Sequence, residues 1–242
     1  MTALTNQVAV VTGASSGIGR AIALALAAQG AILCLVGRKR ETLEVVAKSA
    51  RATSPRLMCY QADLTQDKDI QVLAAALQRD VGSVDVLVHS AGVYSQGRIE
   101  SDTLENLDRQ YRTNVRAPYA LTQALLPLLK SHRGQVVFLN STRGLSAGAK
   151  VGQYAASKHA LKAIADTLRE EVNADGVRVL SVFLGRTASP LQEAIHRMEG
   201  KAYHPERLIQ PEDVAAVVIN ALSLPRSAEV TDISIRPLAK PS

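Results

Sequence analysis

Tyr154 and Lys158 lie four residues apart in the stretch QYAASKHALK, which has the pattern of a helix start. Side chains at that spacing share one face of a helix. A free tyrosine has a pKa of about 10, and a neighbouring cation lowers that pKa. The pair can therefore be a proton donor and the cation that tunes it. The alternative is a tyrosine packed on a sheet beside a solvated lysine, because such pairs also occur by chance.

A glycine-rich segment, VVTGASSGIGRAIA, stands between the first apolar run and the first helical pattern. Its Gly13, Gly17 and Gly19 follow the spacing G-x-x-x-G-x-G. Glycines let backbone N–H groups approach a pyrophosphate, and a helix N-terminus adds the positive end of its dipole. We predict a phosphate-binding turn here, and a merely tight turn is the weaker alternative.

Short apolar runs alternate with helical patterns along the whole chain. Strands are predicted at residues 8–13, 31–37, 56–63, 84–92, 134–141, 177–185 and 229–237. The first six are largely continuous apolar runs, which is typical of strands buried on both faces of a parallel sheet. This order predicts an α/β fold, a doubly wound parallel sheet of about seven strands with helices on both faces. No linker divides the chain, so residues 1–242 are predicted to form a single domain.

Residues 186–210 interrupt the alternation between the sixth predicted strand and the last long helix. Loops that follow the carboxyl ends of strands build ligand crevices in such sheets. We therefore predict a substrate loop or lid at 186–210, with a plain surface excursion as the alternative.

Composition excludes several classes of protein. The chain has 242 residues, of which 47% are hydrophobic and 21% charged, as in a globular protein. No apolar run approaches the roughly 20 residues that span a bilayer, and no signal peptide is recognised at the N-terminus, so a cytoplasmic protein without membrane partners is expected. Cys34 and Cys59 lie in apolar runs and are predicted to be buried free thiols. No His or Cys cluster has metal-ligand spacing, so no catalytic metal is expected.

The net charge of +6 invites a comparison with nucleic-acid-binding proteins. Lysines and arginines are dispersed, however, and aromatic residues, which stack on bases, make up only 3% of the chain. We expect no nucleic-acid partner. A modest basic excess also suits an anionic small molecule.

The glycine loop TGASSGIG and the Tyr154/Lys158 pair together resemble the short-chain dehydrogenase/reductase (SDR) family, and the resemblance covers residues 8–237. It implies a Rossmann fold, a nicotinamide cofactor, and hydride transfer between a carbonyl and an alcohol. It also implies two further catalytic residues. Ser141 would hydrogen-bond the substrate oxygen, with Thr142 as its rival, and Asn114 would hold a water for a proton relay, where a surface asparagine is the alternative.

The end of the second predicted strand indicates which nicotinamide cofactor is used. NAD binders place an acidic residue there to accept hydrogen bonds from the ribose. Here Gly37 takes that place, followed by Arg38 and Lys39, and guanidinium groups pair with phosphates. We therefore predict NADP(H). Solvated charge is the alternative, although cations are unfavourable at a helix N-terminus.

The resemblance also implies the remaining cofactor-binding residues. They are Gly13, Ser15, Ser16, Gly17, Ile18, Gly19, Arg38, Lys39, Asp63, Leu64, Ser90, Ala91, Gly92, Tyr154, Lys158, Gly185 and Thr187. Asp63 would bind the adenine amino group, but an N-cap before a helix explains it equally well. His89 and Ser90 replace two asparagines of the family pattern, and Leu184 replaces a proline before Gly185. Ser189 is the rival of Thr187 beside the carboxamide.

The substrate is predicted only as a small-molecule carbonyl or alcohol. Tyr94, Arg143 and Arg186 are among the candidate lining residues, and the two arginines could recognise an acidic substrate or face solvent or cofactor. Long amphipathic helices predicted at 101–130 and 153–173 resemble those that form homodimers and homotetramers in the family. A non-catalytic NADP-binding regulator on the same fold is the alternative function, and a nucleic-acid-binding protein is a third.

Overall fold

The protein is built on one parallel sheet, seen in a computed structural model that describes residues 4–238. The strands run in the spatial order β3-β2-β1-β4-β5-β6-β7, and every neighbouring pair is parallel. Their bounds are β1 (Val8–Thr12), β2 (Ile32–Gly37), β3 (Leu57–Gln61), β4 (Val86–His89), β5 (Gln135–Ser141), β6 (Arg178–Leu184) and β7 (Asp232–Ile235). The predicted parallel sheet of seven strands is confirmed.

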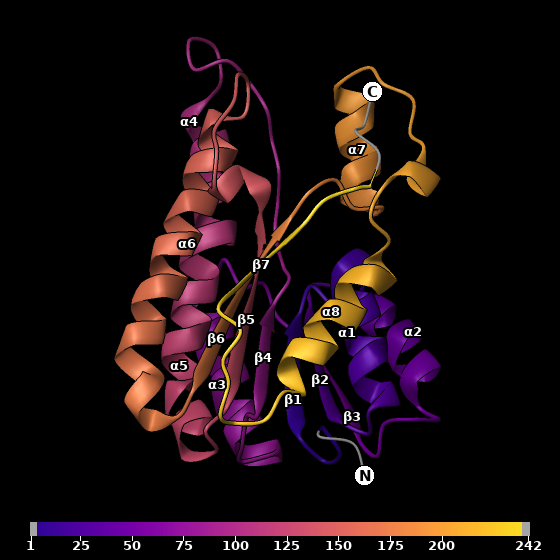
Figure 1. Ribbon diagram of the computed structural model, residues 1–242, viewed down its shortest axis with the longest axis vertical. Helices are drawn as coiled ribbons and strands as arrows, with labels where there is room; N and C mark the ends of the chain where they lie inside the picture. Colours follow the sequence, from indigo (N-terminus) through magenta and orange to yellow (C-terminus); the bar gives the residue numbers. More distant parts are fainter. Residues whose placement is uncertain (1–3, 239–242) are drawn as a thin grey trace.

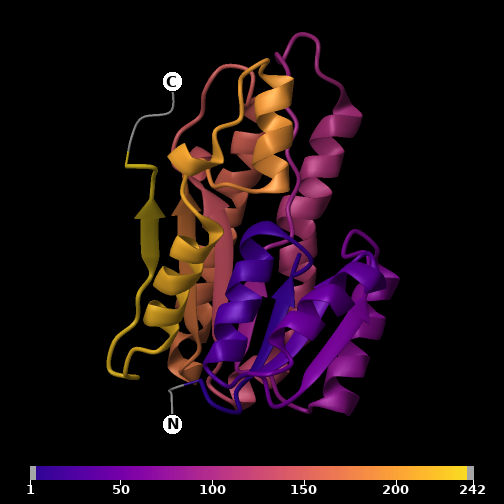
Figure 2. The ribbon, with the colours of Figure 1, turned by 90° about the vertical axis from the view of Figure 1, so that its right-hand side faces the viewer.

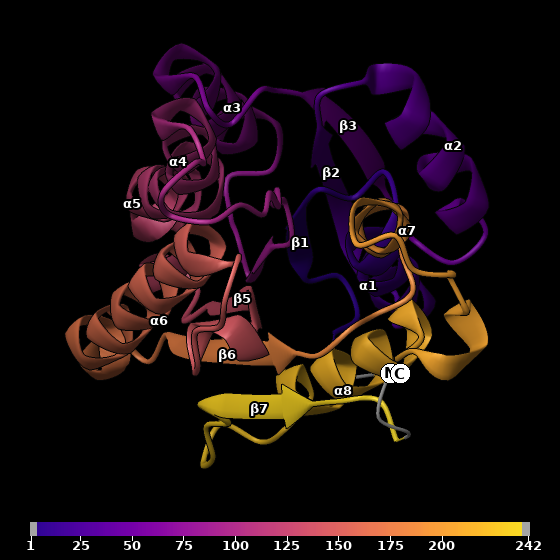
Figure 3. The ribbon, with the colours of Figure 1, turned by 90° about the horizontal axis from the view of Figure 1, so that it is seen from above.

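Helices cover both faces of this sheet (Figures 1 and 3). They are α1 (Gly17–Ala28), α2 (Arg40–Ala50), α3 (Asp67–Asp80), α4 (Leu104–Tyr111), α5 (Ala117–Ser131), α6 (Gly152–Val172), α7 (Pro190–Met198) and α8 (Pro211–Leu222). One apolar core joins the sheet to α1, α2 and α8, and a second joins its other face to α3, α5 and α6. The fold is therefore the doubly wound one that the strand–helix alternation predicts. No helix within residues 4–238 is long and apolar enough to cross a membrane.

The predicted strands are in the right places, but some of their ends are wrong. The run predicted as 84–92 leaves the sheet after His89, because the backbone N–H groups of Ser90 and Ala91 donate to the Thr12 hydroxyl instead of to a strand. Similarly, the run predicted as 229–237 is paired only over Asp232–Ile235, and the carboxylate of Glu229 accepts from the Val179 N–H. Side-chain acceptors therefore take the place of ladder hydrogen bonds after the end of β4 and before the start of β7.

The long helix predicted over 101–130 is interrupted. A π-helical turn, Arg112–Arg116, separates α4 from α5 and contains Asn114. Wider turns of this kind occur mostly as single insertions inside α-helices and are frequent at functional sites. Residues 153–173, by contrast, fall in one continuous helix apart from a short 3₁₀ turn at the end.

The strand order reverses between β1 and β4, and ligands of such sheets bind outside the carboxyl ends of the strands at that point. These ends point upward in Figure 1, toward the space between the upper part of α6 and α7. The segment after β6 contributes α7 to this edge, and Figure 2 shows it above α1 and α8.

Residues 186–210 are an ordered element rather than an irregular loop. Thr187 pairs with Ile209 in an isolated parallel bridge, and the N–H of Ala188 donates to the Ile209 carbonyl at 2.8 Å. The Ser189 N–H donates to the Tyr203 hydroxyl at 3.1 Å. These contacts tie the two ends of the segment together, with α7 between them.

Candidate active site

Three of the four predicted catalytic residues line one cavity of about 480 Å³ at the carboxyl edge of the sheet. Ser141 is the last residue of β5, and Tyr154 and Lys158 lie in the first turns of α6, which begins at Gly152. The spacing of Tyr154 and Lys158 places both side chains on the face of α6 that looks into the cavity. Residues far apart in the sequence therefore meet where the sequence analysis expects them to meet.

Lys158 is only 6% exposed, which is unusual for a lysine. Its Nζ donates to the Leu139 carbonyl at 2.9 Å and lies 5.9 Å from the centre of the Tyr154 ring. Burial disfavours the charged ammonium and lowers the pKa of Lys158 to about 8. The side chain is thus held as a fixed group beside the phenol.

The pKa of Tyr154 departs from the sequence-based expectation. Burial raises the pKa of Tyr154 to about 12, although a hydrogen bond with Ser141 lowers it, and the neighbouring Tyr94 raises it slightly further. The ring of Tyr94 stands edge-on to that of Tyr154, with centroids 4.9 Å apart. The lowering of this pKa expected from Lys158 is not found, and loss of hydration on burial is the largest cause of the shift. Tyr154 is therefore a protonated phenol at neutral pH.

Asn140 is a site residue that the sequence analysis did not identify. Its Oδ1 accepts from the Ser141 N–H at 2.8 Å, and its Nδ2 donates to the Lys158 carbonyl at 3.2 Å. One buried amide thereby ties the end of β5 to α6. The sequence feature that could have identified Asn140 is a polar residue inside the apolar run VVFLNS. Thr142, the rival of Ser141, also lines the cavity.

Asn114 lies behind the cavity rather than on its lining. It is 1% exposed, and its Oδ1 accepts from the Val93 N–H while its Nδ2 donates to the Val93 carbonyl, both at 2.9 Å. The same Nδ2 donates to the Ser157 hydroxyl at 3.1 Å, and that hydroxyl donates to the Tyr154 carbonyl at 2.7 Å. Asn114 therefore joins the loop after β4 to the turn of α6 that carries Tyr154.

Replacing Asn114 by alanine should lower the free energy of unfolding by roughly 1 to 3 kcal/mol, because the Val93 backbone loses both partners in a partly buried place. Equilibrium urea unfolding measures this change. Asn220→Ala is the matched control, since Asn220 is exposed on α8 and should change stability by less than about 0.5 kcal/mol. Equal effects of the two substitutions would contradict the role of Asn114.

A second cavity of about 260 Å³ lies against the glycine loop and continues into the first. Both cavities are lined by Ile18, Ser90, Ala91, Gly92, Val93, Ser189 and Leu191, so they form one continuous groove. Of the predicted cofactor-binding residues, the second cavity is lined by Gly13, Ser15, Ser16, Gly17, Ile18, Arg38, Asp63, Leu64, Ser90, Ala91 and Gly92. Gly185 and Thr187 line the first cavity beside Tyr154 and Lys158.

Where the chain passes from β1 to α1, the positions of Gly13 and Gly19 leave no room for a side chain. A Cβ at Gly13, which has φ of 63°, would lie 2.9 Å from the Cα of Ala91. A Cβ at Gly19 would overlap the Gly13 carbonyl oxygen, so Gly19 packs helix against strand and does not line the groove. The backbone of the turn and the N-terminus of α1 are thereby exposed to a ligand, as an anion cradle requires.

Arg38 and Lys39 are placed differently. Arg38 lines the second cavity together with Ser15 and Gly37, whereas exposed Lys39 is the N-cap residue of α2 and is not on the lining. Among the residues that the structure describes, Asp63 is the only acid on this lining. A phosphate beside Arg38 and Ser15 would therefore meet a guanidinium and a hydroxyl.

Asp63 is not a helix N-cap. The N-cap residue of α3 is Gln66, and Asp63 Oδ1 instead accepts from the N–H and the hydroxyl of Thr65, at 3.0 and 2.8 Å. The carboxylate forms a local turn after β3 while lining the second cavity. The alternative explanation of Asp63 as an N-cap is therefore wrong.

Of the two residues that replace the family's asparagines, His89 bonds through its side chain and Ser90 through its backbone N–H. His89 is buried, stacks on Phe138 with ring centres 4.9 Å apart, and has its Nε2 2.8 Å from the Thr122 hydroxyl. Burial lowers the pKa of His89 to about 3, so the ring is neutral. Thr12 binds the backbone of the loop after β4, accepting from Ser90 and Ala91 N–H groups at 3.0 and 3.2 Å.

The segment after β6 reaches both cavities. The Thr187 hydroxyl donates to the Gly185 carbonyl at 3.2 Å, and the Ser189 hydroxyl donates to the Thr187 carbonyl at 3.2 Å. Ser189 Oγ also accepts from the Gln192 N–H at 3.1 Å, as the N-cap of α7. Ser189 Cβ would be 3.2 Å from a Cβ at Gly17, so this segment packs directly on the glycine loop. Thr187 and its rival Ser189 both remain candidates.

A groove that runs from a glycine cradle to Ser141, Tyr154 and Lys158 is typical of an oxidoreductase of the Rossmann class. The profile of the family described as short chain dehydrogenase matches residues 7–200, and the chain belongs to the short-chain dehydrogenase/reductase family. An uncharacterised oxidoreductase of Staphylococcus epidermidis is 32% identical over 239 residues, covering 98% of this chain and all of that protein. A relative from Staphylococcus aureus is 31% identical over the same length.

Solved structures agree with this assignment. An alcohol dehydrogenase from the archaeon Thermococcus sibiricus, complexed with 5-hydroxy-NADP, superposes with a TM-score of 0.89 at 26% identity, covering 98% of this chain and 99% of that one. A metagenomic short-chain oxidoreductase in complex with NADP has a TM-score of 0.85 at 30% identity, covering 99% and 100% of the two chains.

Proposed function

We propose that the protein is an NADP(H)-dependent oxidoreductase that interconverts a carbonyl and an alcohol. The observation that carries the proposal is the convergence of Ser141, Tyr154 and Lys158 on one end of a groove whose other end is the glycine cradle. Such a groove can hold a cofactor at one end and a reacting carbonyl at the other. A small-molecule substrate is in keeping with the family.

In the reductive direction the phenol of Tyr154 donates the proton and the substrate carbonyl oxygen accepts it. A bound reduced nicotinamide would supply the hydride to the carbonyl carbon, and this hydride together with the proton from Tyr154 would complete the alcohol. Ser141 donates a hydrogen bond to the same oxygen and stabilises the charge that develops there. Lys158, held by the Leu139 carbonyl, places an ammonium beside the phenol.

The titration of the two groups supports this division of roles. With its pKa raised to about 12, Tyr154 holds its proton near pH 7 and serves as the acid. A positive charge close to the phenolate lowers its pKa and eases proton transfer. Lys158, whose pKa is lowered to about 8, still carries that charge on most molecules at neutral pH.

The cofactor that fits this chain best is NADP(H). Arg38 and Ser15 line the cradle where NAD-binding proteins have an acidic residue, and guanidinium groups pair well with phosphates. The two solved relatives named above hold NADP or a derivative of it. Gly13, Ser16, Gly17 and Ile18 would surround the pyrophosphate.

Arg38→Ala should raise the Kd for NADPH by about 10- to 100-fold and leave that for NADH within about threefold, because a charge-assisted hydrogen bond contributes about 1.5 to 3 kcal/mol. Fluorescence titration of the reduced nicotinamide measures both constants. Arg40→Ala is the control, since Arg40 pairs with Glu44 at 2.9 Å and does not line the cradle. Tighter binding of NADH than NADPH to the unchanged protein would defeat the cofactor assignment.

The proposal has three further parts, which concern a water relay, a lid and the oligomeric state. Asn114 orders the backbone of Val93 beside the groove, where a proton-relay water would be held. Residues 186–210 act as a lid over the substrate, since α7 and its flanks line both cavities. The chain forms homodimers or homotetramers, and exposed Leu104 and Tyr119 on α4 and α5 provide apolar surface for this.

A non-catalytic NADP-binding regulator is the second candidate function. It shares the cradle but has no need of a buried lysine beside a tyrosine. The test is a panel of aldehydes and ketones, with NADPH oxidation followed by absorbance. Turnover of at least one carbonyl supports the enzyme, and NADPH binding without turnover of any compound supports the regulator.

A further inference from the structure

The cavity that contains Tyr154 carries an excess of positive charge beyond its catalytic lysine. Within residues 4–238, its charged lining residues are Lys158, Arg143, Arg186, Arg236 and a single acid, Glu199. None of the three arginines lines the second cavity, and neither does Glu199. The excess therefore belongs to the part of the groove that lies beyond the nucleotide cradle, where a substrate would lie.

Arg186 already binds one carboxylate in the structure, that of Glu199. Its Nη2 donates to both oxygens of Glu199 at 2.8 Å, and the two side chains are 29% and 18% exposed. Lys201 Nζ lies 3.9 Å from the same carboxylate. A half-buried guanidinium that accommodates both oxygens of one carboxylate can do the same for a ligand. Glu199 is then an internal competitor for that place.

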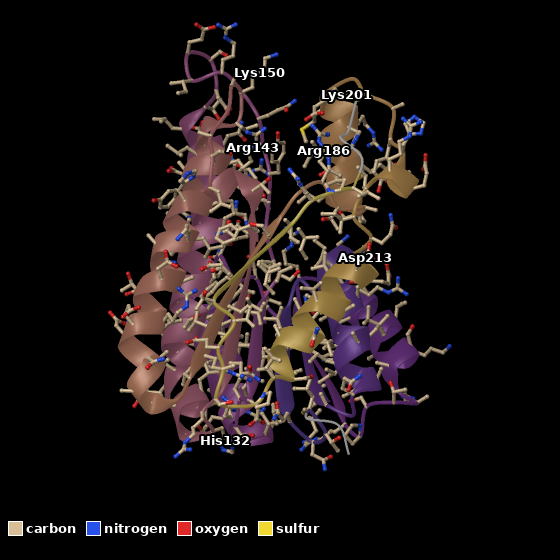
Figure 4. The ribbon with its side chains drawn as sticks, viewed as in Figure 1. His132, Arg143, Lys150, Arg186, Lys201 and Asp213 are labelled. Carbon is tan, nitrogen blue, oxygen red and sulfur yellow. The ribbon has the colours of Figure 1, made fainter. Side chains whose placement is uncertain are left out.

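Arg143 stands on the other side of the cavity and pairs with no acid within residues 4–238. It follows Ser141 by two residues, and its own N–H donates to the Ser141 hydroxyl at 3.1 Å. The guanidinium lies over Gly148, with Nη1 2.8 Å from where a Cβ would be, and makes one long contact of 3.5 Å to the Ala147 carbonyl. Figure 4 shows Arg143 beside the upper end of α6 and Arg186 across the gap, beside α7.

The lining also has an apolar part, which includes Val93, Leu139, Val151, Leu184 and Ile195. These side chains offer no hydrogen bonds to a ligand, so they suit a hydrocarbon segment between two polar ends. The polar ends are then the carbonyl at Tyr154 and an anionic group at the arginines. Lys150 and Lys201, higher on the two sides in Figure 4, add positive charge that attracts an anion toward the opening.

We propose that Arg143 and Arg186 form a carboxylate subsite, so that the substrate is a keto or aldehyde acid, or the corresponding hydroxy acid. The proposal deepens the function proposed above and rests on it. Glu199 holds Arg186 in place when no substrate is bound, and the substrate carboxylate displaces it. Because Glu199 competes for Arg186, it weakens the binding of every anion there.

Matched ligand pairs test the subsite without relying on turnover. Pyruvate, levulinate and para-acetylbenzoate are each compared with their amides, which keep the ketone and the size but remove the charge. Calorimetric binding to the protein saturated with NADP⁺, in which no reduction can occur, gives the affinities. NADPH oxidation then gives kcat/KM for the same compounds.

At least one acid is expected to bind about tenfold or more tightly than its amide, because a hydrogen bond between two charged groups exceeds one to a neutral amide. Arg186→Gln and Arg143→Gln should each remove most of this preference without weakening amide binding. Glu199→Gln should act in the opposite direction and tighten acid binding severalfold. Arg197→Gln is the control, since Arg197 is exposed on α7, pairs with Glu193 at 3.6 Å and does not line the cavity.

The outcomes separate this proposal from the function it rests on. Tighter binding of an acid that depends on Arg186, without any turnover, supports the subsite and contradicts the reductase. Turnover with equal kcat/KM for acids and amides supports the reductase and overturns the subsite. If no acid binds better than its amide, including the case in which neither binds, the subsite is likewise overturned.

Discussion

Tyr154→Phe is expected to lower kcat/KM for any carbonyl substrate by about 10²- to 10⁴-fold, the range that a positioned general acid contributes. The substitution removes only the phenolic oxygen, which has a hydrogen bond with Ser141 and whose pKa burial raises to about 12. The ring itself and its edge-on contact with Tyr94 remain. Cofactor affinity and the unfolding midpoint should therefore stay close to those of the unchanged protein.

Tyr94→Phe is the matched control for this result. Tyr94 lines the same cavity and its hydroxyl binds the side chain of Gln96 at 3.1 Å, on the loop after β4. Its loss should change kcat/KM by less than about tenfold, since no proton is transferred from it. Steady-state rates of both variants with one substrate make the comparison. Full turnover by Tyr154→Phe would end the proposed role of that phenol.

Gly13→Ala is expected to have the second large effect, on the cofactor rather than on the chemistry. The methyl group must adopt a left-handed backbone conformation at φ of 63°, which costs about 1 to 2 kcal/mol. It also comes within 2.9 Å of the backbone of Ala91, which lines both cavities. The loops after β1 and β4 must separate, and the NADPH affinity should fall at least about tenfold, or 1.4 kcal/mol.

Gly82→Ala separates the two causes. Gly82 has φ of 68°, but an added Cβ there would meet only the Gln78 carbonyl oxygen at 3.7 Å, between α3 and β4 and away from the groove. The free energy of unfolding of this variant should fall by about 1 to 2 kcal/mol, while its NADPH affinity should stay unchanged. Thermal unfolding with and without NADPH reports both quantities. An unchanged NADPH affinity in Gly13→Ala would contradict the placement of the cradle.

Much of the fold follows from features that a single sequence displays. Strands buried on both faces read as continuous apolar runs, so β1, β2 and β5 are predicted to within one or two residues. The glycine loop and the Tyr154/Lys158 pair depend only on spacing within a short segment, and the sequence shows that spacing directly. Both are therefore predicted from the sequence.

Other features depend on partners that are distant in the sequence. The interruption at Arg112–Arg116 places Asn114 against Val93 and Ser157, and no periodicity in the helix marks it. Asn140 likewise matters because Lys158 lies across from it. Side-chain partners of this kind are decided by the packing of β4, β5 and α6 together, which the order of elements alone does not specify.

The pKa of Tyr154 shows the same limit in energetic terms. The spacing of Tyr154 and Lys158 predicts a nearby cation and hence a lowered pKa, yet in the structure burial raises it. Burial also lowers the pKa of Lys158, since the same loss of hydration disfavours the charged form of each. Sequence spacing gives the distance between two groups, but their hydration depends on what surrounds the completed cavity.

The central claim is that this groove transfers a hydride from NADPH to a carbonyl carbon while Tyr154 supplies the proton. The most direct test supplies NADPH deuterated at the transferable position with a reactive carbonyl in ordinary water, and analyses the alcohol by mass spectrometry and NMR. We predict one deuterium on the carbinol carbon, formed by the unchanged protein and greatly slowed in Tyr154→Phe. An alcohol without deuterium on that carbon, or NADPH oxidation with no alcohol formed, would contradict the claim.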